Sequence, residues 1–343
     1  MARSRFRTEL TTAQLPLSAA ELVARGVTRS MRCGPKWRRT SRGFFLPSQL
    51  PDTPTQRILA AVPLVPASGA ITGWAAAFAR GVDDLDGLDP CTMQPLPVLI
   101  CLGRDVGRGT AAAYCRDRLP DSDVAEVAGI RFTTALRAGM DCARSAPDLA
   151  EAVAVVDAMA RQRVFGLGLL ARYLGRHPGW RGIHQARRAC ELADPHARNG
   201  WESRLRVFYQ VDLGLPRPLA NAPLFDRRGN LLGIGDLVDP DAGLVLEFDG
   251  QDHRGRHRHR ADNVREERLE DHHLVVIRVD SLDLRHHRAD LKARVLSGRR
   301  RGLARDRSRD RWTLRQPDWW LADEPIDEQL TAEELGWLLG DGR

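Results

Sequence analysis

Two carboxylates one residue apart end an apolar run in the C-terminal third of the chain. Residues 244–253 read LVLEFDGQDH, so Glu247 and Asp249 close a predicted strand. Side chains alternate along a strand, which puts both acids on one face. Acids at the end of an apolar strand cost folding free energy unless a cation meets them. The pattern therefore indicates a site for a divalent metal ion or for a nearby arginine.

A third carboxylate, Asp236, lies in a strand predicted over 231–238, and the turn 239–243 joins it to the strand of Glu247. In such a hairpin Asp236 and Glu247 come side by side. Glu202, in the first turn of a helix predicted over 201–213, completes an oxygen-rich pocket. Such a pocket suits Mg²⁺, or Mn²⁺, which binds carboxylates, waters and a substrate phosphate. The ion would polarise a phosphodiester and lower the pKa of a bound water.

The elements around these acids form one unit. A charged helix is predicted over 262–270 and a buried strand over 274–279, which gives the order α-β-β-α-β. Breaks at Asp194-Pro195 and Asn199-Gly200 predict a domain boundary before the first helix. We therefore expect a domain over 196–297.

This domain resembles the PD-(D/E)XK nuclease superfamily, and in particular its branch related to very-short-patch-repair endonucleases. The resemblance implies a restriction-endonuclease-like core and covers residues 196–297. The matching residues are Glu202-Ser-Arg-Leu-Arg206, Asp236, Glu247-x-Asp249-Gly250-x-x-His253, Asp262-x-x-Arg265 and the run 274–279.

By this resemblance, Asp236 and Glu247 hold the metal and Glu202 supports it. Arg265 steadies the site. His253 is a general base or a phosphate contact, and a structural hydrogen bond to one of the acids is the alternative for it.

The chain departs from the superfamily at the lysine that usually follows two residues after the glutamate, because Asp249 stands there. Activation of water must then come from His253, from Gln251 or from the metal alone. Otherwise the site is catalytically dead.

A basic loop follows the acids, with arginines alternating along it. We expect it to lie over DNA near the carboxylates, and a solvated loop is the alternative. Its arginines are Arg254, Arg256, Arg258 and Arg260.

The first fifty residues are basic. Ser18 and Glu21 form a predicted capping box, residues 29–42 contain six cations and no acid, and 43–47 is a predicted strand. This order favours a winged helix-turn-helix with Arg38, Arg39 and Arg42 on DNA phosphates, or else a solvated basic hairpin.

This N-terminal part resembles AbiEi-type antitoxins, which implies a winged-helix repressor with a cognate toxin as partner. The resemblance rests on 11–15, on 37–47 and on the helical segment after them. The chain departs from the pattern at 133–135, where Thr-Thr-Ala replaces the usual Ser-Pro pair.

The middle region, 51–195, mixes helix and strand before becoming helical. Residues 71–77 are predicted to be helical, 97–101 and 129–132 to be strands, and a helix begins near Ser145. No residue pattern here indicates chemistry.

The last segment, 298–343, is basic and then acidic. Eight arginines and two aspartates give residues 299–315 a charge of +6, and seven acids and one arginine give 322–343 a charge of −6. The two blocks are predicted to neutralise one another, and competition of the acidic tail with DNA is the alternative. Trp312, Trp319 and Trp320 are predicted to pin the tail to a domain surface.

Composition sets outer limits. The net charge of +7 and the pI near 9.5 permit a polyanionic partner, although a genome that favours arginine produces the same excess. Six cysteines without a paired spacing indicate a reducing compartment. Neither a signal peptide nor an apolar run of about 20 residues is present in the sequence, so we expect a cytoplasmic protein without a membrane partner.

Together these patterns predict an α/β multidomain protein. Its expected parts are a winged-helix-like unit (1–50), an α/β-to-helical middle region (51–195), a nuclease-like domain with an α-β-β-α-β core (196–297) and a charged tail (298–343). The expected function is Mg²⁺-dependent hydrolysis of DNA. The alternatives are a DNA-binding regulator of the antitoxin type whose nuclease fold is degenerate, and an antitoxin that binds an acidic toxin.

Overall fold

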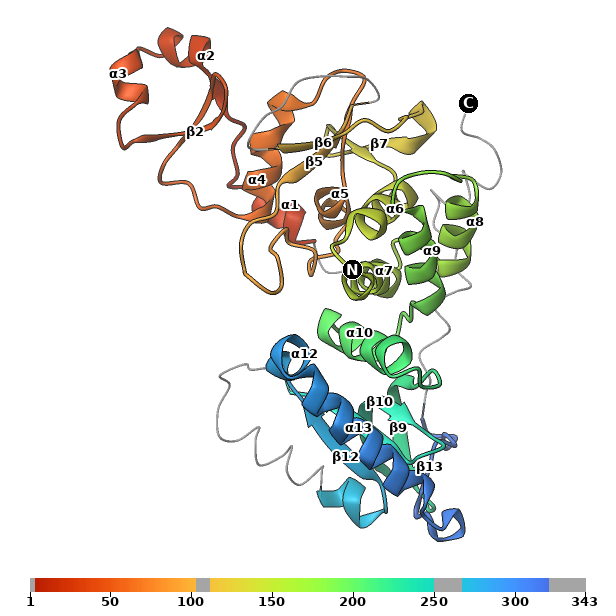
Figure 1. Cartoon of the computed structure of the whole chain (residues 1–343). Helices are drawn as coiled ribbons and strands as arrows, with labels where there is room; N and C mark the ends of the chain where they lie inside the picture. The colour runs from red at the N-terminus through yellow and green to blue at the C-terminus, as the bar shows by residue number, and fades with distance from the viewer. Residues whose placement is uncertain (1–3, 103–111, 250–266, 321–343) are drawn as a thin grey trace. The chain divides into compact units, whose positions relative to one another are not determined.

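The computed structural model describes residues 4–102, 112–249 and 267–320. It is a mixed α/β protein that divides into two compact units (Figure 1). Of the described residues, 4–102, 112–146 and 162–187 form the N-terminal unit. The C-terminal unit consists of 147–161, 188–249 and 267–320. None of the described helices is both long and apolar enough to cross a membrane.

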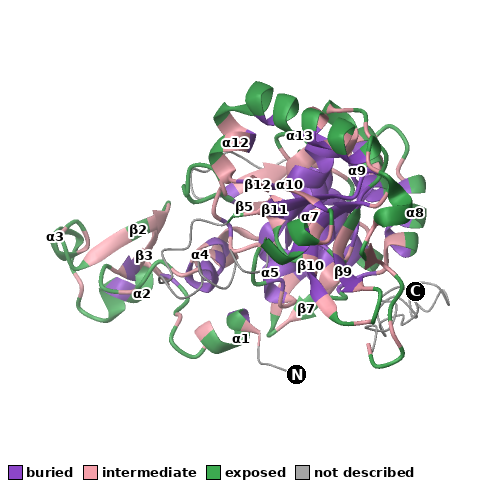
Figure 2. Cartoon of the chain, turned by 90° about the horizontal axis from the view of Figure 1, so that it is seen from below, coloured by how far each residue is buried: buried purple, intermediate pink, exposed green. Residues whose placement is uncertain are grey.

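The N-terminal unit begins with a small antiparallel sheet, of strand order β1-β3-β2, that carries two short helices. The capping box predicted at Ser18 and Glu21 is confirmed. Helix α3 has no buried residue, and Figure 2 shows it as an exposed element. The elements are α1 (Arg5–Glu9), β1 (Leu17–Ser18), α2 (Ala19–Ala24), α3 (Arg29–Arg32), β2 (Trp37–Ser41) and β3 (Phe44–Pro47).

The rest of this unit is a five-stranded mixed sheet of order β6-β5-β4-β8-β7 with helices packed on it. Every residue of α5 is buried, and Phe6 of α1 packs edge-on against Phe78 and Phe132. The elements are α4 (Pro54–Ala61), β4 (Ala70–Thr72), α5 (Trp74–Ala79), β5 (Val98–Cys101), β6 (Ala112–Cys115), β7 (Val124–Val127), β8 (Ile130–Thr133), α6 (Ala135–Ser145), α8 (Leu167–Gly175) and α9 (Ile183–Leu192), which runs into the C-terminal unit.

The helix predicted over 71–77 is wrong at its start. Ile71 and Thr72 belong to β4, which pairs with β5 and β8, and the helix begins only at Trp74. Gly73, with a φ of 67°, allows the sharp turn between them.

The C-terminal unit is built on a five-stranded sheet of order β12-β11-β10-β9-β13. Strands β9, β10 and β11 form an antiparallel meander, and β12 is parallel to β11. The elements are α7 (Leu149–Arg161), α10 (Gly200–Val207), a π-helical turn (Phe208–Asp212), β9 (Leu219–Asp226), β10 (Leu231–Asp239), β11 (Leu244–Phe248), β12 (Val275–Val279), α12 (Ser281–His286), α13 (Arg288–Leu303) and β13 (Trp312–Thr313).

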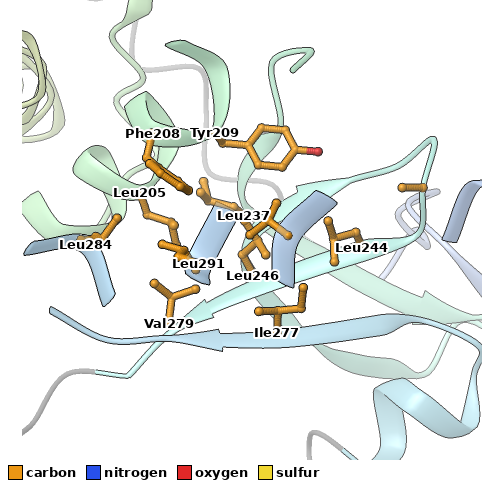
Figure 3. Close-up of a cluster of buried hydrophobic side chains, with 12 residues drawn as sticks. Leu205, Phe208, Tyr209, Leu237, Leu244, Leu246, Ile277, Val279, Leu284 and Leu291 are labelled. Carbon is orange, nitrogen blue, oxygen red and sulfur yellow. The ribbon is translucent and has the colours of Figure 1, made fainter. Parts of the chain in front are cut away.

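Two apolar clusters lie on the two faces of this sheet. On one face, side chains of α10, α12 and α13 pack against the sheet, as Figure 3 shows; this cluster includes Leu205, Phe208, Leu237, Leu246, Ile277 and Leu291. The opposite face carries Leu224, Val238, Val245, Leu269 and Leu274. Residues that alternate with the first cluster along β10 and β11 therefore point to the second face.

Helix α7 belongs to this unit although the sequence analysis placed it in the middle region. Asp157 of α7 accepts hydrogen bonds from Ser203 and Arg206 of α10 and from the amide of Asp194. The domain boundary predicted near 195 therefore falls inside the C-terminal unit.

Two of the three tryptophans predicted to pin the tail contact strand β9 and the turn after it. Trp319 and Trp320 pack edge-on against Phe225 of β9, and the Trp319 indole donates to the Gly229 carbonyl at 3.1 Å. The acidic residues that follow lie outside the described residues.

Candidate functional site

One row of four polar residues crosses the C-terminal sheet, one from each of β9 to β12. Leu237 pairs with Ala220 and with Leu246, so the preceding residue, Asp236, lies between Asn221 and Glu247. Glu247 is the direct partner of Arg278 in β12. We call Asn221, Asp236, Glu247 and Arg278 the polar row. The next row is apolar, with Leu237, Leu246 and Ile277.

The two carboxylates of the row are neighbours, as the sequence predicts. Opposite residues of an antiparallel pair share a face at a Cα distance of about 5 Å. The Phe248 amide donates to Asp236 Oδ2 at 2.7 Å, which shows that the Asp236 side chain reaches across to β11. Asp236 is half-buried, and Glu247 is 8% exposed. Two acids from adjacent strands thus meet where β11 ends.

Glu202 is attached to this row from helix α10. Its carboxylate accepts hydrogen bonds from the Arg198 amide (2.7 Å), Asn199 Nδ2 (2.6 Å) and Asn221 Nδ2 (2.6 Å). Asn199 is the N-cap of α10, so the carboxylate is fixed at the start of the helix. Glu202 is 3% exposed and reaches the polar row through Asn221.

The pocket of three carboxylates predicted from the sequence is not formed. Within residues 4–102, 112–249 and 267–320, no three Asp, Glu, His or Cys side chains gather as metal ligands would. The reason is that Glu202 already accepts three hydrogen bonds, which direct it to Asn221. Asp236 and Glu247 therefore stand as a pair.

Asn221 supplies a third oxygen that the sequence analysis missed. It adopts a φ of 47°, a left-handed conformation that asparagine tolerates better than most residues. Its Nδ2 donates to Glu202 and to the His196 carbonyl, while its Oδ1 is buried and has no hydrogen-bond partner in the described part of the chain. An amide oxygen beside two carboxylates is the donor set that Mg²⁺ and Ca²⁺ prefer, so these residues fit such an ion.

Negative charge accumulates around Glu202 and Asp236. Burial raises the pKa of Glu202, and the charge of Asp236 raises it further, while hydrogen bonds from Arg198 and Asn221 act in the opposite direction. The charge of Asp236 is therefore close enough to disfavour the ionisation of Glu202. A cation at the polar row would relieve this repulsion.

Arg278 is the cation that the chain itself places in the row. It is half-buried, and its register puts it on the same face as Glu247. The signal in the sequence is a single charge inside the apolar run 274–279.

Asp249 lies beyond the end of β11. It is exposed, and its amide donates to the Val279 carbonyl at 2.8 Å, which continues the pairing with β12. Of the other predicted site residues, Gln251, His253, Arg254, Arg256, Arg258, Arg260 and Arg265 lie outside the described residues.

The three arginines predicted to contact DNA in the N-terminal hairpin have different surroundings. Arg38 forms an ion pair with Asp52 at 3.1 Å, and Arg39 donates from Nε to the Ser41 carbonyl at 3.1 Å. Arg39 and Arg42 are exposed. Of the three, Arg39 and Arg42 are therefore the better placed to contact a partner.

The chain was compared with protein-family models, with curated proteins and with solved structures. None of them matches. The geometry of the polar row and the resemblances drawn from the sequence are therefore what indicates a function.

Proposed function

We propose that this protein hydrolyses phosphodiester bonds of DNA with a divalent metal ion held by Asp236 and Glu247. The observation that carries the proposal is the convergence of these two acids from neighbouring strands, beside the buried amide oxygen of Asn221. The excess of positive charge over the chain favours a polyanionic substrate. The resemblance to PD-(D/E)XK nucleases implies the same two ligands.

Each residue of the row has a separate task in this proposal. The chemistry that Mg²⁺ supplies when bound is polarisation of the phosphodiester and a lower pKa for a bound water. The Phe248 amide fixes the orientation of Asp236 through its hydrogen bond. Glu202, held at the N-terminus of α10, fixes the side-chain amide of Asn221. Glu202 is thus a positioning residue.

Arg278 takes the place of the lysine that the superfamily carries and that Asp249 replaces here. In the register of β11 and β12 it adjoins Glu247, so its guanidinium would contact a phosphate bound by the ion that Asp236 and Glu247 would hold. A guanidinium binds phosphate through two parallel hydrogen bonds and stays charged, which neutralises developing negative charge.

The test is nicking of supercoiled plasmid by the full chain in Mg²⁺ and in Mn²⁺. We expect nicking that chelation abolishes and that Glu247→Ala and Asp236→Asn both remove. Asp241→Asn is the matched control, because Asp241 is a 65% exposed acid in the turn between the same two strands. Absence of nicking by the unaltered chain in both metals would refute the proposal.

A second candidate is a DNA-binding regulator that does not cleave. The observation in its favour is Asp249, an exposed acid where the superfamily uses a cation, together with the exposed Arg39 and Arg42 of the N-terminal hairpin. Deletion of residues 1–50 is not a clean test, because it also removes Phe6 from the core. The double change Arg39→Gln and Arg42→Gln leaves the core intact.

Binding of the double variant to DNA of its own promoter distinguishes the two candidates. A regulator loses affinity, and the slope of log affinity against log salt falls by about 2, one for each phosphate contact. Arg188→Gln, an exposed arginine of α9, is the control. Unchanged affinity of the double variant would count against the regulator.

A further inference from the structure

A hollow on the N-terminal unit gathers arginines outside the polar row. It has a volume of about 450 Å³ and lies between strand β2, helix α4 and the start of β5. One side is polar, with Arg38, Arg39, Arg57 and Asp52. The other side is apolar, with Ala60 and the segment 95–98, which reads PLPV. This volume is in the range of small-molecule sites.

Several guanidinium donors at this hollow lack acceptors. Arg38 donates from Nη1 to Asp52 at 3.1 Å, but its Nε and Nη2 are buried and have no hydrogen-bond partner among the described residues. Arg57 donates to the carbonyls of Asp86 and Gly87, and its Nε also lacks a partner there. A buried donor without an acceptor destabilises the fold, and a bound anion would remove this cost by accepting the hydrogen bonds.

The charges of the lining favour an anion with one phosphate. Three guanidinium groups and one carboxylate leave a net charge of +2. Burial lowers the pKa of Arg57, and the charges of Asp52 and Asp86 only partly compensate. A bound anion would stabilise that cation. Asp52 would repel a chain of several phosphates, so a single phosphate fits better.

The apolar side of the hollow favours a ligand in which the phosphate is attached to an apolar ring. Pro95, Leu96 and Pro97 are exposed, and Val98 and Ala60 extend the same wall. Such a wall buries the flat face of a ring when a ligand covers it. Since the side chain of Arg38 is 34% exposed, rotation of its terminal torsions can turn the free donors toward the hollow.

We propose that this hollow binds a nucleoside monophosphate unit, with the phosphate on Arg38 and Arg39 and the ring against the wall 95–98. The source of that unit is a free nucleotide or a nucleotide of a DNA strand. This site belongs to the N-terminal unit and does not depend on cleavage at the polar row.

The test is a calorimetric titration of the full chain with a nucleoside monophosphate. Inorganic phosphate is the second probe. We expect the nucleotide to bind more tightly than phosphate. Arg38→Gln should weaken nucleotide binding about tenfold or more, because it removes charge-assisted hydrogen bonds. Arg25→Gln, an exposed arginine of the same unit outside the lining, should leave it unchanged.

Leu96→Ser tests the wall without touching an arginine or adding a charge. Leu96 is 39% exposed, so the change is tolerated by the fold, and it should weaken the nucleotide but not phosphate. A single-stranded oligonucleotide that displaces the nucleotide identifies a DNA strand as the source, and failure to displace identifies the free nucleotide. Nucleotide binding no tighter than phosphate, or binding unchanged in Arg38→Gln, would overturn the proposal.

Discussion

Two groups of buried charges, one in each unit, differ in how completely their charges are balanced. In the N-terminal unit, Arg137 is fully buried and donates from Nε to Asp141, from Nη1 to Asp123 and to the Arg118 carbonyl, and from Nη2 to Cys101 Sγ. Asp141 also accepts hydrogen bonds from Thr72 and from Arg144. Charges and hydrogen bonds are thus balanced around Arg137.

In the polar row of the C-terminal unit, carboxylates accumulate at one end of a hairpin. Glu202 is disfavoured as an anion by burial and by Asp236, and the neighbouring Asn221 keeps an oxygen without a partner in the described part of the chain. The comparison teaches that buried charge by itself does not indicate a site. A buried oxygen without a hydrogen-bond partner in the described part of the chain, such as Asn221 Oδ1, is the better indicator.

The largest effect on stability is expected when Arg137 is removed from its buried partners. Arg137→Met leaves Asp141 and Asp123 without their common partner and should lower the free energy of unfolding by about 3–5 kcal/mol. Urea denaturation of the full chain measures it. Arg188→Met is the control, since the Arg188–Glu191 pair is exposed and such pairs contribute at most about 1 kcal/mol. Equal losses in the two variants would contradict the balance that we describe.

The polar row should respond to metal instead. At 100 times its dissociation constant, a divalent ion that binds only the folded state stabilises it by about 2.7 kcal/mol. We expect Mg²⁺ or Mn²⁺ to raise the melting temperature of the C-terminal unit, and Glu247→Gln to abolish the rise. A rise that persists in Glu247→Gln would place the ion elsewhere.

Asp194 offers an intermediate effect that depends on pH. Burial opposes its ionisation, but hydrogen bonds from the His196 ring and amide and the charge of Arg206 hold its pKa at about 2. Because this pKa is lowered from 3.8, the stabilisation is present above pH 4 and is lost as the pH falls toward 2. The shift corresponds to about 2 kcal/mol.

Asp194→Asn should therefore lower stability at pH 7 and flatten its fall between pH 4 and pH 2. Denaturant titrations at a series of pH values measure both. A variant that keeps the full acid dependence would show that other carboxyls carry it.

The smallest effect is expected for the free energy of unfolding of the Glu247→Gln variant when no metal is present. The amide keeps the shape of the side chain and removes repulsion from Asp236, so the free energy of unfolding should change by less than about 1 kcal/mol. Urea denaturation with a chelator measures it. A loss near 3 kcal/mol would mean that Glu247 is bound to Arg278 as firmly as Arg137 is to its partners, and would favour the regulator over the nuclease.

The sequence predicted the pair Asp236 and Glu247 because strand alternation and a short turn are local properties. It missed strand β9, since prolines at 216, 218 and 223 argue against a strand. Pro223 is tolerated because β13 pairs only with Phe225 and Asp226, so the outer edge of β9 at Pro223 lies beyond that pairing.

Because β9 was not predicted, Asn221 was not recognised as part of the site. The hydrogen bond from Asn221 to Glu202 was therefore not predicted either. The boundary predicted near residue 195 falls inside the C-terminal unit for a similar reason. The link between Asp157 and Arg206 joins residues 49 positions apart and leaves no local pattern. Periodicity and capping predict single elements, whereas the choice of partner depends on packing that only the folded chain reveals.

The membership of helix α7 in the C-terminal unit has a consequence for synthesis. The chain leaves the ribosome from its N-terminus, so Asp157 emerges long before Arg206, its partner 49 residues later. A fragment that starts at residue 196 would expose the buried Arg206 and the face of α10 that α7 covers. The sequence suggests a contiguous domain that begins at residue 196. A fragment that begins there would lack helix α7, which belongs to the C-terminal unit.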